Sequence, residues 1–252
     1  MHHNRVTALS HSLHHQRSLF PHFALITALL APLTAAAQAV PADPPAALTS
    51  PGLVAASTIS GADTAWLMVS TALVLLMTLP GIALFYGGMV RRFNVINTMA
   101  SVVGIAAVVS LLWFGVAYSL AFTPGGALGG FIGGVERMGF SGMEFLGSTG
   151  QVAVSHIAKH VPESVFAMFQ LTFAIITCAL VVGALVERMH FGALLTFTGL
   201  WLLLVYAPIA HWVWEPGGWL AQLGALDFAG GSVVHINAGA AALVCAYALG
   251  PR

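Results

Sequence analysis

Two ionisable side chains stand in an almost uncharged apolar run near the end of the chain. The run begins at Asp227 and carries His235 eight residues later. Eight helical residues rise about 12 Å at about 1.5 Å each, which would place His235 near mid-membrane in a span that begins at Asp227. An ionisable residue inside a span is costly and by default indicates a functional site. A neutral imidazole donates through one ring nitrogen and accepts through the other, so it can pass on a small polar solute.

Three aromatic residues in the preceding segments suggest a site for a small cation. Phe169 and Phe173 are four residues apart and would share a helix face, and Trp214 ends the next apolar segment. Aromatic faces attract a cation by about 0.5–2 kcal/mol. Ordinary packing and a tryptophan at the membrane interface explain the same residues. Asp227 likewise has two interpretations, a helix cap or a charge that stabilises a cation.

Composition requires elements that cross a lipid bilayer. Hydrophobic residues make up 58% of the chain and charged residues 6%, with a mean hydropathy of +0.91. Soluble domains carry about 25% charged residues. The formal net charge is zero, so no basic patch predicts nucleic-acid binding. The lipid bilayer is therefore the expected partner of most of the surface.

Five apolar segments are each long enough to span a bilayer, which needs about 20 residues. They cover approximately residues 64–90, 95–122, 164–186, 191–214 and 228–250. We expect an all-α integral membrane protein, with a glycine-rich loop over residues 123–163 forming a flexible or partly re-entrant cap. Pro80 and Pro208 should kink their spans.

Basic residues between the segments predict the orientation. Arg91, Arg92 and Arg188 fall on one side if the spans alternate, and Arg137 and Lys159 fall on the other. The positive-inside rule makes the first side cytoplasmic, which gives an N-out, C-in topology.

The N-terminal region has the pattern of a secretory leader. Arg5 and Arg17 precede a short apolar core, and Ala37-Gln38-Ala39 is a small-residue cleavage site. We predict a signal peptide over residues 1–39, a flexible extracytoplasmic linker over 40–62 and a membrane domain over 63–252.

Four stretches together resemble the ammonium transporter family, the Amt/Mep/Rh proteins. They are the run from Pro80 to Arg92, Gly183 to Arg188, Tyr206 to Trp214, and the run that begins at Asp227 and continues to the last residue. They occur in the order and at the approximate spacing of the family's first five helices. The resemblance covers nearly all of the chain after the leader.

The resemblance implies a fold of eleven helices, in which two five-helix halves of opposite orientation surround a pore. This chain matches the first inverted repeat, and we expect either a truncated sequence or a genuine half. The family also implies a homotrimer in the cytoplasmic (inner) membrane and a PII-type regulatory protein as a possible partner.

By the same resemblance, Phe169 and Trp214 line an outer ammonium site near Asp227. Phe173 gates the pore beneath it, and His235 is one of two facing pore histidines that contact ammonia or relay a proton. The implied function is passage of ammonium as ammonia, with or without a separately moving proton. The alternative is a non-conducting ammonium sensor, or an assembly partner of a full-length transporter.

The histidines allow a rival prediction, a membrane redox protein that binds haem or a metal. His156 and His160 are spaced as a ligand pair if their segment is helical, and His211 and His235 are further candidates. Only His235 is expected at mid-membrane, so the sequence offers it no axial partner. We therefore expect no metal, no cofactor and no enzyme activity.

Overall fold

The computed structural model describes residues 48–251. The predicted signal peptide, the first residues of the predicted linker and Arg252 lie outside this part of the chain. The described residues belong to a single compact unit.

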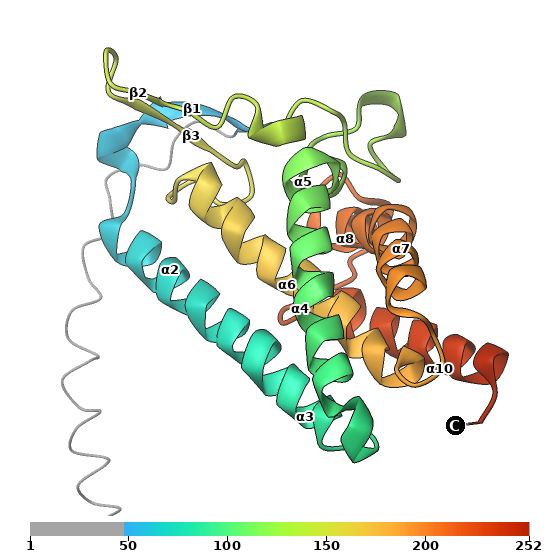
Figure 1. Ribbon diagram of the computed structural model, residues 1–252. Coiled ribbons are helices and arrows are strands. Elements are labelled where there is room, and N and C mark those ends of the chain that lie inside the picture. The colour runs from blue at the N-terminus through green and yellow to red at the C-terminus, as the bar shows by residue number, and fades with distance from the viewer. Residues whose placement is uncertain (1–47, 252) are drawn as a thin grey trace, which may run out of the picture. The chain divides into compact units, whose positions relative to one another are not determined.

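Five long apolar helices confirm the predicted five spans. They run over Gly61–Gly87, Arg92–Phe122, Glu163–Leu185, Phe191–Gln222 and Gly231–Leu249 (Figure 1). The first span contains α2 (Gly61–Leu76) and α3 (Ala83–Gly87), and the second contains α4 (Val95–Leu112) and α5 (Tyr118–Phe122). The third is α6 (Glu163–Leu185). The fourth contains α7 (Phe191–Trp201), α8 (Ala207–Trp214) and α9 (Trp219–Gln222), and the fifth contains α10 (Asn237–Leu249). The chain is a multi-pass membrane protein.

Wider π-helical turns interrupt three of these spans and begin the fifth. One covers Met77–Ile82 and contains Pro80, and another, Leu202–Tyr206, ends two residues before Pro208. Proline lacks the N–H that continues an α-helix, which explains why both predicted kink sites lie at such a turn. The other two cover Trp113–Ala117 and Gly231–Ile236. The last contains His235, and π-turns are frequent at functional sites.

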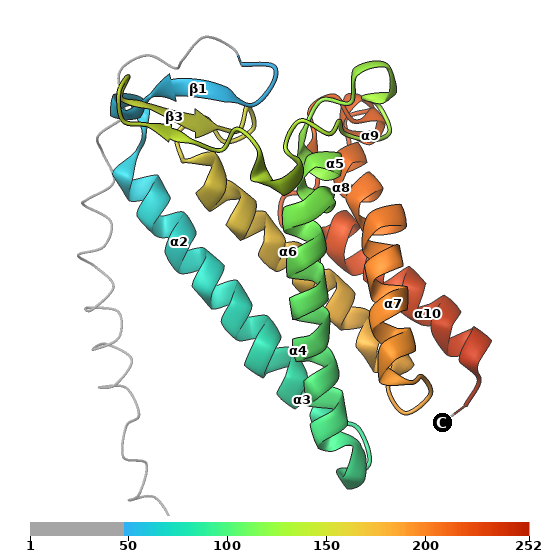
Figure 2. The ribbon, with the colours of Figure 1, turned by 45° about the horizontal axis from the view of Figure 1, so that its top comes forward.

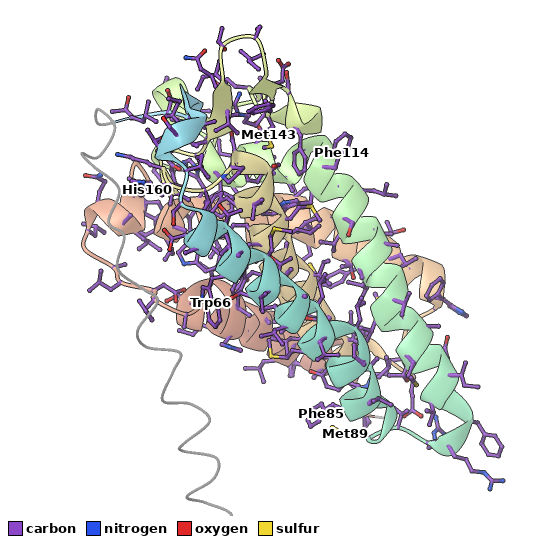
Figure 3. All side chains as sticks on the ribbon, turned by 90° about the vertical axis from the view of Figure 1, so that its left-hand side faces the viewer. Trp66, Phe85, Met89, Phe114, Met143 and His160 are labelled. Atoms are coloured by element: carbon purple, nitrogen blue, oxygen red, sulfur yellow. The ribbon has the colours of Figure 1, made fainter. Side chains whose placement is uncertain are left out.

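Helix α6 forms the centre of the bundle. It packs against α2, α4 and α10, and α4 also contacts α7 (Figure 2). Many large side chains on the first span point outward instead; Trp66 and Phe85 are both more than 60% exposed (Figure 3). Exposed apolar side chains of this kind are what a lipid-facing helix presents, since lipid tails are as apolar as leucine.

A small antiparallel sheet, which the sequence did not predict, caps one end of the helical bundle. Its strands are β1 (Gly52–Ala55), β2 (Phe145–Leu146) and β3 (Gln151–Val154), in the order β1-β3-β2. Strand β1 pairs with β3 in the register Leu53 to Ala153. Part of the predicted flexible linker is therefore a strand, because its backbone groups pair with a segment about a hundred residues away. We call this end of the bundle the sheet end.

The loop over residues 123–163, predicted as a flexible or partly re-entrant cap, makes defined contacts at Arg137. Arg137 Nε lies 3.0 and 3.1 Å from the two carboxylate oxygens of Glu163, which is fully buried. The Tyr118 hydroxyl donates to the same carboxylate at 3.1 Å, and the Arg137 backbone N–H donates to Ser119 Oγ. This buried cluster fastens the loop to the start of α6 and the end of the second span.

A single carboxylate links two turns at the opposite end of the bundle. Glu187 Oε1 accepts hydrogen bonds from Asn94 Nδ2 at 2.6 Å, from Arg91 Nε at 3.0 Å and from the Arg91 backbone N–H at 3.2 Å. Glu187 has a φ of +66°, which non-glycine residues rarely adopt. We call this end the Glu187 end. The contacts join the turn between the first two spans to the turn between α6 and α7.

These contacts predict a measurable pH dependence. The Asn94 hydrogen bond, then those from Arg91, hold the pKa of the Glu187 carboxyl down at about 2, whereas an unfolded Glu titrates near about 4.3. Because the folded pKa is the lower one, this stabilisation is present above pH 4.3 and is lost as the pH falls toward 2. The wild-type melting temperature should exceed that of Glu187→Gln at pH 7, and the difference should shrink between pH 5 and 3. A difference that stays constant over this range would contradict the assignment.

Candidate functional site

Three aromatic side chains meet near the sheet end, between α6 and α8. Helix α6 places Phe169 and Phe173 one turn apart, with ring centroids 5.0 Å apart and nearly perpendicular planes. The Phe173 ring meets Trp214, the last residue of α8, edge to face at 5.9 Å. Trp214 also stacks on Phe122 at 6.4 Å, with an angle of 12° between the planes. The three aromatic residues singled out in the sequence therefore form one cluster.

A pocket of about 280 Å³ opens beside this cluster. Its lining combines aromatic rings from α5, α6 and α8 with the chain that leads into the fifth span. The lining residues are Phe122, Ile157, Phe169, Gln170, Phe173, Trp214, Asp227, Phe228, Ala229 and Gly230. Phe169, Phe173, Trp214 and Asp227 are thus brought together, whereas His235 does not line this pocket.

Gln170 and Asp227 are the residues with polar side chains in this pocket lining. The Gln170 side-chain oxygen is buried and has no hydrogen-bond partner within the described residues. A buried acceptor without a partner costs about 1–3 kcal/mol.

Asp227 caps the fifth span. Its Oδ1 accepts the Gly231 N–H at 2.7 Å, and its Oδ2 accepts the N–H groups of Ser232 and Val233, each at 2.9 Å. Gly230 makes the turn possible with a φ of +82°, a left-handed conformation that favours glycine. The Asp227 carbonyl accepts the indole N–H of Trp214 at 3.2 Å. One residue therefore starts the helix and anchors the tryptophan of the cluster.

His235 lies further along the same span, in the π-helical turn Gly231–Ile236. Val233 and Val234 are buried against the bundle, whereas His235 is exposed on the other side of the helix. The other large exposed side chains of this span include Ile236, Leu243, Val244 and Tyr247. The imidazole therefore lies on a face of this span that the described residues do not cover.

Comparison with known proteins decides the family. The family model described as Ammonium Transporter Family matches residues 65–252, which is most of the chain. The chain belongs to the ammonium transporter family. An ammonium transporter of Bacillus subtilis is 50% identical over 190 residues, which cover 75% of this chain and 44% of that relative. This chain thus spans less than half the length of that relative.

Solved structures of the ammonium transporter family share the fold. Mep2 of Candida albicans superposes with a TM-score of 0.67 at 35% identity, covering 77% of this chain and 40% of Mep2. A structure described as a sensor Amt protein superposes with a TM-score of 0.63 at 25% identity, covering 75% of this chain and 44% of that protein.

Several pocket residues of this ammonium transporter family member were missed by sequence reasoning. Phe122 ends the second span, and Phe228 follows Asp227, so neither carries a signal that separates it from its apolar neighbours. Gln170 did carry a sequence signal, because it is an amide between two aromatic residues in a segment otherwise almost free of polar side chains.

The remaining histidines are distributed among separate contacts. His156 and His160 lie in an irregular segment and not on a helix, so the spacing expected of a ligand pair does not apply. His211 is fully buried between the carbonyls of Ala121 and Gly129, at 3.2 and 2.7 Å. His156 Nε2 lies 2.8 Å from Glu215 Oε1, and both side chains are buried. Across residues 48–251, no three His, Cys, Asp or Glu side chains come together as metal ligands would.

Proposed function

We propose that this chain takes part in the passage of ammonium, as ammonia, across the cytoplasmic membrane. The aromatic pocket would receive the ammonium ion, Phe173 would gate the path beneath it, and His235 would contact the solute deeper in the membrane. The observation that carries the proposal is the pocket, in which Phe169, Phe173 and Trp214 surround a space of small-solute size. Two further observations support ammonium as the substrate: the chain belongs to the ammonium transporter family, and the relative from Bacillus subtilis is described as an ammonium transporter.

The pocket has the chemistry that weak recognition of a cation requires. Ring faces attract an ammonium ion by about 0.5–2 kcal/mol and do not trap it as a direct carboxylate ligand would. The Gln170 amide, which also lines the pocket, would turn its oxygen toward one of the N–H groups of the ion. Asp227 would attract the cation through the electric field of its charge and not by direct contact, because both carboxylate oxygens already accept backbone hydrogen bonds.

The distribution of charge supports an orientation with the sheet end outside. Arg91, Arg92 and Arg188 lie at the Glu187 end, where the positive-inside rule expects the cytoplasm. Most described carboxylates lie instead in the segments of the sheet end, where they would attract a cation. These are Asp63, Glu136, Glu144, Glu163, Glu215 and Asp227.

Uptake of methylammonium into proteoliposomes tests the proposal. The purified chain should support saturable uptake of the labelled cation, and excess ammonium should compete with it, whereas excess sodium should not. Uptake equal to that of protein-free vesicles would contradict conduction by this chain.

Replacement of His235 tests its proposed place in the path. His235→Ala should slow uptake by about tenfold or more, because an intramembrane polar contact for the solute is lost. Membrane insertion and melting temperature should remain close to wild type, since exposed side chains usually contribute within about 0.5 kcal/mol. Ile236→Ala, at the exposed neighbouring position, is the matched control. Equal uptake rates and selectivity in His235→Ala and wild type would remove His235 from the path.

One observation favours the alternative function, an ammonium sensor or an assembly partner of a full-length transporter. The exposed face of the fifth span combines His235 with large apolar side chains, and it would be covered if another protein segment packed there. Ammonium binding at Trp214 without any methylammonium uptake would support this alternative. The homotrimer and the PII-type partner remain predictions from the family.

A further inference from the structure

A buried histidine–glutamate contact joins two segments that are far apart in the sequence at the sheet end. His156 follows β3 in the irregular segment before α6, and Glu215 follows α8. The ring nitrogen Nε2 of His156 lies 2.8 Å from Oε1 of Glu215, and the side chains are only 3% and 4% exposed. The sequence separation is 59 residues, so the contact fixes the position of one segment relative to the other.

Each member of the pair is next in sequence to a residue that lines the aromatic pocket. Ile157 follows His156, and Trp214 precedes Glu215. Local hydrogen bonds restrain both neighbourhoods: the Ile157 N–H donates to Ser155 Oγ, and the Glu215 N–H donates to the His211 carbonyl. A shift of either side chain of the pair would therefore displace a wall of the pocket.

The pair is not saturated with hydrogen bonds, as a purely stabilising contact would be. Glu215 Oε2 and His156 Nδ1 are buried and have no partner within the described residues. Both residues line a second cavity, of about 710 Å³, together with Lys159 and the glycine-rich backbone around Gly129. A buried pair with unmet hydrogen bonds is weak evidence for a role in stability, and replacing such pairs by apolar residues is often neutral. A role in positioning the pocket walls accounts better for the presence of two polar side chains at this buried place.

We propose that His156 and Glu215 are positioning residues for the aromatic pocket. Their contact holds Trp214 edge to face with Phe173 and keeps Ile157 in the pocket lining. The pair does not touch the solute, and its effect on affinity rests on the proposed function of the pocket. Its effect on the geometry of Trp214 does not depend on that function.

The test measures the solvent exposure of the Trp214 side chain. The fluorescence of Trp214 is obtained in each background as the difference from the corresponding Trp214→Phe variant, and its exposure is measured by acrylamide quenching. Glu215→Ala should increase the quenching constant of Trp214 by about twofold, because a misplaced wall opens the pocket to water. Glu215→Gln retains a hydrogen-bonding group for His156 and should stay near the wild-type value. Arg91→Ala, which breaks an ion pair at the Glu187 end, is the matched control and should leave Trp214 unchanged.

A second variant covers the case in which Glu215→Ala fails to fold. The double variant His156→Phe/Glu215→Leu replaces the pair by apolar residues of similar size, a change that commonly preserves folding. It should still raise the quenching of Trp214. Unchanged quenching in a folded double variant would overturn the proposal.

Kinetics then separate positioning from general damage. In proteoliposomes, Glu215→Ala should raise the half-saturating methylammonium concentration by about tenfold, since small misplacements of a site weaken it strongly, while the maximal rate stays within about twofold. An equal loss in both quantities, without a change at Trp214, would assign the pair a purely structural role. If wild-type vesicles show no uptake, the proposed function fails, but the fluorescence comparison still decides the positioning role.

Discussion

Replacing Asp227 by alanine should cause one of the largest losses of both stability and uptake. The three backbone N–H groups of Gly231, Ser232 and Val233 would lose the carboxylate that accepts them. Loss of a strong helix cap costs about 2 kcal/mol, which corresponds to a fall of about 5 °C in melting temperature for a chain of this size. Fraying at this turn would also release the Trp214 indole from the Asp227 carbonyl. Methylammonium uptake should therefore fall by about tenfold or more.

Asp227→Asn separates the cap from the charge. Asparagine is also a good N-cap, so this variant should keep most of the stability. If the field of the carboxylate attracts the cation, uptake at low substrate concentration should fall while the melting temperature does not. Wild-type stability and uptake in Asp227→Ala would contradict both roles.

Removing Glu163 should cause the largest loss of stability. Glu163→Ala leaves the Arg137 guanidinium, which is only 13% exposed, without its carboxylate, and leaves the Tyr118 hydroxyl without its acceptor. Breaking a buried pair from one side costs about 3–5 kcal/mol, or roughly 10 °C in melting temperature for a chain of this size. Thermal unfolding in detergent, followed by tryptophan fluorescence, measures the effect.

A double variant shows whether the unpaired charge causes the loss. In Arg137→Met/Glu163→Leu the buried charges are both absent, and the melting temperature should recover most of the way toward wild type. A double variant as unstable as Glu163→Ala would mean that packing at the start of α6 accounts for the loss and the ion pair does not.

The membrane spans were predictable because lipid imposes a simple rule. Backbone groups in the hydrocarbon region must bond within their own segment, so a long apolar run such as residues 164–186 is helical. The structure begins and ends this helix within a residue of the prediction, at Glu163 and Leu185. The cap at Asp227 was also predictable, because a carboxylate that precedes an apolar helix has local N–H groups to accept.

Contacts outside the spans depend on partners that are distant in the sequence. Nothing within residues 52–55 specifies pairing with residues 151–154, so a strand was interpreted as a linker. Glu215 carried no recognisable signal for the same reason, since its partner His156 lies 59 residues away. Phe169 and Trp214 also have an explanation in ordinary packing, and their role in binding a cation stays a prediction; the structure adds that both line one pocket.

Titration of Trp214 with ammonium tests the central claim, that the aromatic pocket binds this cation. Tryptophan in the chain is replaced by 5-fluorotryptophan, and the Trp214 fluorine resonance is assigned from its absence in Trp214→Phe. Ammonium chloride should shift this resonance saturably, sodium chloride should not, and Phe169→Leu should weaken the response by removing one ring of the site. The resonance of Trp66, which lies exposed on the first span, should not respond. A Trp214 resonance that does not move, or that moves equally with sodium, would contradict the account.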